Sequence, residues 1–298
     1  MTLELDGTVA VVTGAGAGLG RAEALALARQ GAAVVVNDLG AAASDTVAAI
    51  EALGGKALAV PGDVGERSTA DALIAAATEH FGGLHVVVNN AGVVRDKMLF
   101  NLSDSDWDTV IRVHLRGHFL LSRGAVAHWR ERSKAEGGPV YGRIVNTSSE
   151  AFLSGPAGQA NYGAAKAGIT SLTVSTARAA GRYGVRANAI CPRARTAMTA
   201  ATFGEDAPED VDPLSVDHVA PFVAYLATPA AERITGQVFV VHGGMVALLS
   251  PPSVERRFAA DGELWSLAQL DEQIGHYFDD RDPERMFSAT EVLELNPR

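Results

Sequence analysis

The chain has 298 residues, of which 47% are hydrophobic and 20% are charged, and this composition indicates a folded globular protein large enough for one α/β domain. Its formal net charge of −10 argues against nucleic acid and anionic membrane surfaces as partners. The single Cys191 cannot form an internal disulfide, and the N-terminus carries acids where a secretory signal carries basic residues. No apolar run approaches the ~18 residues of a membrane span. We therefore expect a cytoplasmic protein that binds neither nucleic acid nor membranes.

Short apolar runs alternate with alanine-rich stretches along most of the chain. The runs predict buried strands at Val9–Thr13, Ala33–Asn37, Ala57–Val60, Val86–Asn89, Arg143–Thr147, Arg186–Ile190 and Gln237–Val241. The stretches between them predict helices near 19–30, 43–53, 68–81, 106–131, 159–180 and 217–227. Repeated strand–helix alternation predicts an α/β fold in which a parallel sheet is doubly wound, with helices on both faces.

Two segments fall outside this alternation. Residues 192–216 form a long connection rich in proline, glycine and acids, which is typical of a lid over a site. Residues 249–298 contain "LWSLAQLDEQIGHYF", whose apolar spacing is helical. We therefore expect a mainly helical C-terminal extension, packed on the domain of residues 1–248 or at an oligomer interface.

A glycine-rich loop, "TGAGAGLG", follows the first predicted strand and opens the first predicted helix. Gly14, Gly18 and Gly20 would let the backbone turn tightly and approach a pyrophosphate. The helix that begins near Leu19 would point free N–H groups and its positive dipole end at the phosphates. This context predicts a dinucleotide site, to which the turns "GDV" (62–64) and "NNAG" (89–92) add contacts for the adenosine half.

An acid ends the second predicted strand. Asp38 lies 18 residues after Gly20, where a dinucleotide fold places the carboxylate that binds the adenosine ribose hydroxyls. A carboxylate there repels a 2′-phosphate, and Ala17 offers no positive charge to attract one. We therefore expect NAD in preference to NADP, with a turn-capping role as the alternative for Asp38.

A tyrosine and a lysine lie four residues apart in "NYGAAK". At helical spacing Tyr162 and Lys166 share one face, and a neighbouring ammonium lowers the pKa of a phenol. Ser149 lies 13 residues earlier, at the end of the fifth predicted strand, where ligands bind in such sheets. The three side chains predict general-base catalysis on an alcohol.

Together these features resemble the short-chain dehydrogenase/reductase family. The match rests on "TGAGAGLG", "NNAG", Ser149, Tyr162 and Lys166, and it covers about residues 5–247. It implies a single Rossmann-like domain with a seven-stranded sheet, an NAD(P) cofactor, and homodimers or homotetramers built through the helices near 106–131 and 159–180. It also implies that Ser149 positions the reacting oxygen, Tyr162 transfers the proton, and Lys166 holds the nicotinamide ribose. The cofactor contacts expected on this basis are Gly14, Gly16, Gly18, Leu19, Gly20, Asp38, Asp63, Val64, Asn90, Ala91, Gly92, Tyr162, Lys166, Pro192 and Thr196.

The segment "VHLRGHF" departs from the family pattern, because His114 replaces the usual asparagine that anchors a water chain. A histidine could hold the same water and carry a proton, so we include His114 among the expected catalytic residues. A packed histidine is one alternative, and a metal pair with His118 is another. Since no third ligand presents itself, we expect no metal.

The segments "VNDLG" and "VHLRGHF" resemble the branch that contains the (3R)-hydroxyacyl-CoA dehydrogenase unit of peroxisomal multifunctional enzymes. Our first hypothesis is thus an NAD-dependent dehydrogenase of 3-hydroxyacyl-CoA thioesters. The coenzyme A phosphates could meet four basic residues that flank the expected pocket mouth, with solvated surface charge as the alternative for all four: Arg95, Lys97, Arg193 and Arg195. The alternatives are a dehydrogenase of hydroxysteroids or other apolar alcohols, and an NAD-binding sensor without turnover.

Overall fold

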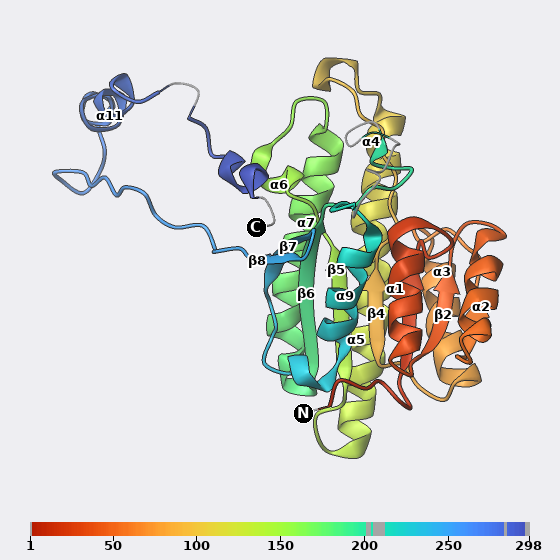
Figure 1. Ribbon diagram of the computed structural model, residues 1–298. Helices are drawn as coiled ribbons and strands as arrows, with labels where there is room; N and C mark the ends of the chain where they lie inside the picture. Colours follow the sequence, from red (N-terminus) through yellow and green to blue (C-terminus); the bar gives the residue numbers. More distant parts are fainter. Residues whose placement is uncertain (1, 201–203, 205–211, 283–284, 296–298) are drawn as a thin grey trace.

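The computed structural model describes residues 2–200, 204, 212–282 and 285–295. One sheet organises the chain (Figure 1). Its strands are β1 (Val9–Thr13), β2 (Ala33–Asn37), β3 (Ala57–Ala59), β4 (Val86–Asn89), β5 (Gly142–Thr147), β6 (Val185–Pro192), β7 (Val238–His242) and β8 (Met245–Leu248). The strand order is β3-β2-β1-β4-β5-β6-β7-β8, and the first seven pair in parallel. The predicted doubly wound α/β fold is confirmed.

The described helices are α1 (Gly18–Arg29), α2 (Ala42–Ala52), α3 (Arg67–Ala75), α4 (Asp104–Ile111), α5 (Gly117–Glu136), α6 (Ala151–Ser154), α7 (Ala160–Ala180), α9 (Ala220–Ala227), α10 (Leu267–Leu270) and α11 (His276–Asp279). Helices α1, α2 and α9 cover one face of the sheet, and α3, α5 and α7 cover the other. Short 3-10 or π turns join or extend several of them: η1 (Ala76–His80), η2 (Leu99–Asn101), η3 (Arg112–Arg116), η4 (Gly181–Tyr183), η5 (Val216–His218), η6 (Pro229–Ala231), η7 (Asp271–Gly275) and η8 (Thr290–Glu294).

Strands β1, β2, β4 and β7 are valine-rich because they are buried on both faces of the sheet. Side chains alternate between the faces, so Val12 packs in the core under α1, α2 and α9, whereas Val11 packs in the core under α3, α5 and α7. The carboxyl ends of the parallel strands meet at one edge of the sheet. The chain reverses its winding direction between β1 and β4, and the loops after those strands leave a crevice where ligands bind in such folds.

The structure corrects the predicted count of seven strands. An eighth strand, β8, runs antiparallel to β7 and pairs Met245 with His242. The two strands are joined by Gly243 and Gly244, whose positive φ angles of 54° and 81° are those of a tight hairpin turn. The Gly-Gly pair was the available sequence signal for this hairpin.

The helix predicted as one stretch near 106–131 is divided. Helix α4 begins at Asp104 with a capping box formed by Ser103 and Asp106, and α5 extends to Glu136. Between them the π turn η3 accommodates one additional residue in its wider hydrogen-bonded loop. The turn rotates the residues after it and carries His114 toward the carboxyl edge of the sheet.

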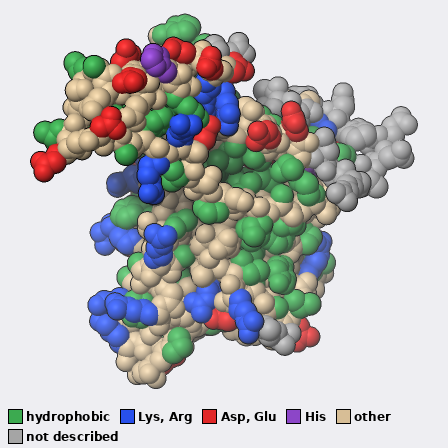
Figure 2. Space-filling view, turned by 90° about the vertical axis from the view of Figure 1, so that its left-hand side faces the viewer, with side chains coloured by type: hydrophobic (Ala, Val, Ile, Leu, Met, Phe, Trp, Pro, Cys, Tyr) green, Lys and Arg blue, Asp and Glu red, His purple; other side chains and the backbone are tan. Residues whose placement is uncertain are grey.

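The segment after β8 leaves the body of the protein, as the blue trace in Figure 1 shows. It contains α10, η7 and α11 at its far end and returns with η8 beside α6. In the space-filling view of this side, hydrophobic side chains gather across the middle of the face and acidic side chains concentrate at its upper end (Figure 2). None of the helices in the described ranges combines the length and the apolar character needed to cross a bilayer.

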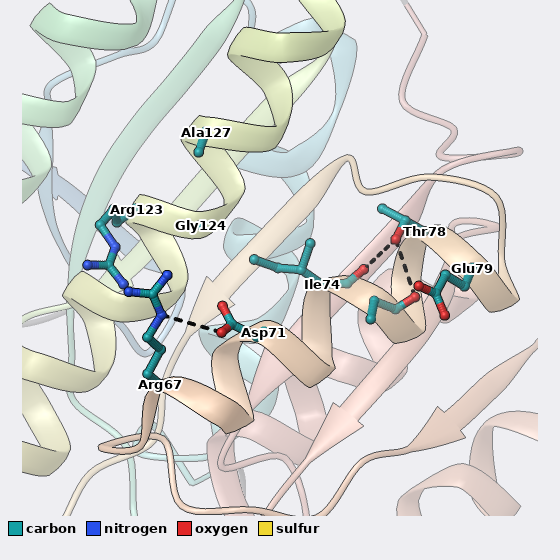
Figure 3. A pocket seen from close by; sticks show the side chains of 9 residues that line it. Arg67, Asp71, Ile74, Thr78, Glu79, Arg123, Gly124 and Ala127 are labelled. Carbon is teal, nitrogen blue, oxygen red and sulfur yellow. Dashed lines mark hydrogen bonds and ion pairs between the residues drawn. The ribbon is translucent and has the colours of Figure 1, made fainter.

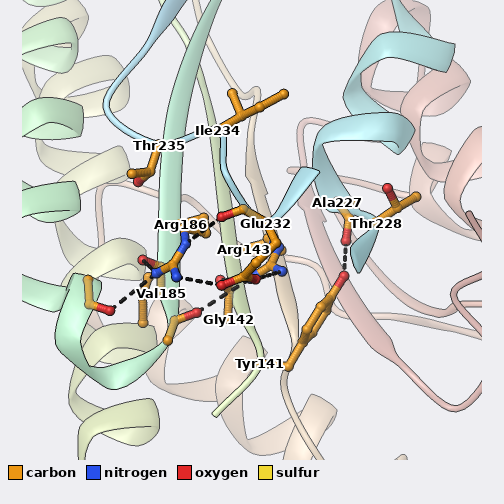
Figure 4. Close-up of polar contacts among 12 residues, drawn as sticks. Tyr141, Gly142, Arg143, Val185, Arg186, Ala227, Thr228, Glu232, Ile234 and Thr235 are labelled. Atoms are coloured by element: carbon orange, nitrogen blue, oxygen red, sulfur yellow. Dashed lines mark hydrogen bonds and ion pairs between the residues drawn. The ribbon is translucent and has the colours of Figure 1, made fainter. Parts of the chain in front are cut away.

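A buried arginine stabilises the edge of the sheet that lies opposite the carboxyl ends of the parallel strands (Figure 4). Arg143, 1% exposed, lies 4.0 Å above the ring of Tyr141 and pairs with Glu232 at 2.6 Å. Glu232 also pairs with Arg186 on the neighbouring strand, and the Tyr141 hydroxyl donates to the carbonyl of Ala227. These contacts join β5 and β6 to the connection between α9 and β7, far from the carboxyl edge.

Candidate active site

The glycine loop after β1 and the turn after β4 pass each other closely. A Cβ atom on Gly14, whose φ is 62°, would lie 2.7 Å from the Cα atom of Ala91, so no larger residue fits there. Asn90 fixes the approach, because its amide donates to the carbonyls of Thr13 (3.0 Å) and Gly14 (3.2 Å). The two loops form a narrow backbone cradle at the start of α1.

This cradle opens into a cavity of about 510 Å³ along the carboxyl edge of the sheet. The cavity is lined by 14 of the residues predicted from sequence: Gly14, Gly18, Leu19, Asp38, Asp63, Val64, Asn90, Ala91, Gly92, His114, Tyr162, Lys166, Pro192 and Thr196. Gly16, Gly20 and Ser149 lie outside the set that lines it. The structure thus brings residues from five strand ends and two helices to one cavity.

Three more lining residues had been placed at the site from sequence: Ala17 of the glycine loop, Gly62 of the turn after β3, and Arg95 at the expected pocket mouth. Sequence reasoning missed the others, which are Asn37, Leu39, Val93, Thr109, Arg112, Val113, Thr147, Ser148, Ala194, Ala197, Met198 and Thr199. Several directly follow a recognised motif, so extending each motif by two or three residues would have found them. Of the expected lid at 192–216, residues 201–203 and 205–211 lie outside the described residues.

Asp38 closes one end of the cavity. Its two carboxylate oxygens accept from the backbone N–H groups of Gly16 (2.9 Å) and Leu39 (2.7 Å). The turn-capping role is therefore real, but each oxygen has a second lone pair. The capped carboxylate is held in one orientation beside the cavity and retains the capacity to accept hydrogen bonds from a ligand.

Asp63 lies in the loop after β3 and is oriented by an arginine. Its pKa is lowered because hydrogen bonds and the charge of Arg112 outweigh a desolvation effect that acts in the opposite direction. Arg112 pairs with it at 2.7 Å and comes from η3, the same π turn that carries His114. This turn therefore contributes to both ends of the cavity.

Tyr162, Lys166 and Ser149 come together at the other end. Helix α7 places Lys166 Nζ 5.2 Å from the centre of the Tyr162 ring. The ammonium group is buried and donates to the carbonyl of Thr147 at 2.6 Å. The side chain of Ser149 interacts with the hydroxyl of Tyr162, and the Ser149 oxygen accepts a hydrogen bond from the N–H of Ala151 at 3.2 Å.

The proton affinities of this group differ from the sequence expectation. Burial raises the pKa of Tyr162 to about 12, although the interaction with Ser149 acts in the opposite direction. Burial also lowers the pKa of Lys166 to about 7. The expected lowering of the Tyr162 pKa by Lys166 is wrong for the protein on its own, because desolvation opposes the charged form of both groups.

His114 lies directly beside the tyrosine. Its ring meets the ring of Tyr162 edge to face, with centres 5.3 Å apart. Nε2 is within hydrogen-bond distance of the Val93 carbonyl (2.7 Å) and N–H (3.0 Å), whereas the buried Nδ1 has no protein partner. Burial, and then the charge of Lys166, hold the pKa of His114 well below its usual value, so the ring is neutral at physiological pH.

His118 lies one helical turn further along and is also buried. Burial lowers its pKa to about 3, and its Nε2 has no protein partner. In the described part of the chain, no group of three or more His, Cys, Asp or Glu side chains is arranged to hold a metal ion.

The four basic residues expected at the pocket mouth are mostly engaged elsewhere. Lys97 pairs with Asp106 at 2.7 Å, Arg193 with Glu150 at 2.7 Å, and Arg195 with Asp212 at 3.1 Å. Only Arg95 among the four lines the cavity. A second hollow, about 630 Å³ between α3 and α5, is open and distant from these groups, and its Arg67 and Asp71 side chains pair with each other (Figure 3).

A family model described as short chain dehydrogenase matches residues 8–207. A hydroxyacyl-CoA dehydrogenase of Mycobacterium tuberculosis, ChsB1, is 61% identical over 98% of this chain and 95% of its own length. The chain belongs to the short-chain dehydrogenase family. A crystal structure of a short chain dehydrogenase from Mycobacterium avium superimposes with a TM-score of 0.84 at 43% identity, covering 94% of this chain and 97% of that one.

A third similar protein is much longer than this short-chain dehydrogenase. Peroxisomal multifunctional enzyme type 2 of mouse is 41% identical over 83% of this chain, which spans 33% of that protein. Short-chain dehydrogenases are oxidoreductases that use a nicotinamide cofactor. The cavity fits such a group, since the glycine cradle leaves room for a pyrophosphate at the N-terminus of α1 and Asp38 lies at the far end.

Proposed function

We propose that the protein interconverts 3-hydroxyacyl-CoA and 3-oxoacyl-CoA thioesters, with NAD as its preferred cofactor. The observation that carries the chemistry is the position of Tyr162, which interacts with the side chain of Ser149 and lies beside Lys166 at the end of a cavity suited to a dinucleotide. The substrate class is supported by the names of two relatives, the hydroxyacyl-CoA dehydrogenase ChsB1 and the multifunctional enzyme.

Each catalytic side chain has a separate task in this proposal. Ser149 holds the substrate oxygen by a hydrogen bond, and Tyr162 removes or returns the proton on that oxygen. A nicotinamide held in this cavity would supply hydride exchange at the carbinol carbon, and the positive charge of its oxidised form would favour the phenolate of Tyr162. Lys166 has a pKa of about 7, so it can pass the tyrosine proton onward at neutral pH.

His114 is proposed to anchor the outer end of this proton path. Its Nε2 is committed to the backbone of Val93, which leaves the buried Nδ1 available to a water molecule. The hydroxyl of Thr147, whose carbonyl accepts from Lys166, is another buried polar atom without a protein partner among the residues that line the cavity. A neutral histidine can accept from such a water without adding a charge next to Lys166.

The preference for NAD follows from the charges that line the cavity. Asp38 places a carboxylate where a 2′-phosphate would lie, and the loop residue beside it is Ala17. The basic lining residues are Arg95, Arg112 and Lys166, of which Arg112 is held by Asp63 and Lys166 is buried at the catalytic end. Arg95 is therefore the residue proposed to meet a phosphate of coenzyme A.

The protein is also proposed to act as a homodimer or homotetramer. Trp107 on α4 and Phe119 on α5 expose 38% and 39% of their surfaces, and such aromatic side chains are enriched at interfaces. Sedimentation of the purified protein distinguishes a monomer from these assemblies.

An absorbance assay of NADH formation tests the proposed reaction. Purified protein is offered 3-hydroxyacyl-CoA thioesters and, separately, hydroxysteroids, with Tyr162→Phe as the inactive control. We expect turnover with the thioesters at a higher kcat/KM than with any steroid. Faster turnover of the steroids would reassign the substrate, and tight NADH binding without turnover of any alcohol would indicate a sensor.

A further inference from the structure

Residues 288–295, which include η8, return to the body of the protein beside α6 (Figure 1). The N–H of Ala289 donates to the carbonyl of Leu153 at 3.0 Å, and the hydroxyl of Ser288 donates to the carbonyl of Ser154 at 3.3 Å. These bonds join residues more than 130 positions apart. The segment from Ser288 to Leu295, here called the returning segment, therefore lies directly on α6.

The returning segment supplies hydrogen-bond donors to backbone carbonyls of α6. A helix leaves its last carbonyls without intrahelical donors, and α6 has only four residues, so this deficit affects most of it. Two of those carbonyls, Leu153 and Ser154, receive their donors from the returning segment. The carboxyl end of α6 is thus fixed by residues outside the dehydrogenase sheet.

The amino end of α6 is held by an arginine that also binds the returning segment. Arg193 forms a two-pronged ion pair with Glu150, with both N–O distances at 2.7 Å, and both side chains are nearly buried. Its remaining donors reach the carbonyls of Val292 and Leu295, each at 2.5 Å, and Nε2 of His242 at 3.1 Å. All five guanidinium N–H groups have a partner, a pattern that a lysine cannot reproduce.

Ser149 directly precedes Glu150 in the chain. The contacts at the two ends of α6 therefore both act on the segment that presents the hydroxyl of Ser149. We infer that the returning segment is a positioning element for Ser149, acting through the Arg193–Glu150 pair and the carboxyl end of α6. This inference rests on the proposed catalytic role of Ser149. When these contacts are loosened, the side chain of Ser149 moves away from the hydroxyl of Tyr162, and the tyrosine loses an interaction that lowers its pKa.

Full-length variants test the inference by steady-state kinetics across pH. Arg193→Lys keeps the charge but loses the fork geometry, and Glu150→Gln keeps the shape but loses the charge. The matched control is Arg281→Lys, because Arg281 also pairs with a glutamate, Glu255, on the projecting part of the extension. Thermal melting of each variant shows that it is folded.

We expect Arg193→Lys and Glu150→Gln to lower kcat about 10-fold or more, as a small misplacement of a catalytic group does, with KM for NAD unchanged. The rising limb of the kcat–pH profile should move to higher pH in both, a shift that loss of stability alone does not produce. Ser288→Ala should lower kcat about 2-fold to 5-fold, as loss of one hydrogen bond of about 1 kcal/mol would, whereas Ser266→Ala, which uncaps α10, should leave it unchanged.

The outcomes separate this inference from the proposed function. If Ser149→Ala retains full activity, the proposed function itself fails. Under the proposed function, Ser149→Ala is expected to be inactive. If, beside it, the Arg193→Lys and Glu150→Gln variants are folded and have the same kcat and the same pH profile as the control Arg281→Lys, the returning segment has no positioning role. An equal loss in Ser288→Ala and Ser266→Ala would likewise contradict it.

Discussion

Glu23 should make the protein less stable as the pH rises. The side chain lies on α1, it is 0% exposed, and neither carboxylate oxygen has a hydrogen-bond partner. Burial raises its pKa from 4.5 to about 8, because an ionised carboxylate cannot be solvated there. The folded protein therefore retains a proton that the unfolded chain releases.

The sign and the size of the effect follow from this difference. Below pH 4.5 both states are protonated and the stability contributed by the proton is fully present; it is lost as the pH rises toward the folded pKa of about 8. The interval spans about 3.5 pH units, which at about 1.36 kcal/mol per unit corresponds to about 5 kcal/mol. Of this, about 3.5 kcal/mol falls between pH 5 and pH 8.

Urea unfolding at pH 5 and pH 8 measures the effect in wild type, Glu23→Gln and Glu23→Leu. The glutamine variant keeps the size and cannot ionise, so its difference from wild type isolates the titration of Glu23 from that of every other group. We expect the free energy of unfolding of wild type to fall relative to both variants between the two pH values. Parallel behaviour of all three proteins would refute the buried, protonated state of Glu23.

Three further predictions concern the site. Tyr162→Phe should lower kcat by about 10²-fold to 10⁴-fold while NADH affinity, measured by fluorescence titration, stays within a few-fold of wild type; a proportionate loss of affinity would indicate that the ring serves only binding. Wild type should use NAD with a higher kcat/KM than NADP, and Asp38→Ala should narrow the ratio; equal values in wild type would contradict the role of Asp38. His114→Asn should retain turnover that His114→Ala loses, and full activity in both would leave His114 a packing residue.

Local patterns in the sequence determined most of the fold and the identity of the central site residues. Strands buried on both faces need unbroken apolar runs, so each of the seven parallel strands was predicted within one or two residues of its ends. The glycine loop was recognisable because a close backbone approach tolerates no Cβ, as at Gly14. Tyr162 and Lys166 were found together because four residues make about one turn of helix.

Only the tertiary structure decided properties that depend on what surrounds a residue. The pKa of Tyr162 rises although a lysine is adjacent, because burial disfavours both charged forms and no spacing rule reports burial. The π turn η3 and the contacts of Arg193 with the returning segment could not be predicted from the sequence either. The partners of Arg193 lie up to 102 residues away in the chain. Such contacts are set by the path of the whole chain, whereas sequence periodicity reports only the environment within a few turns.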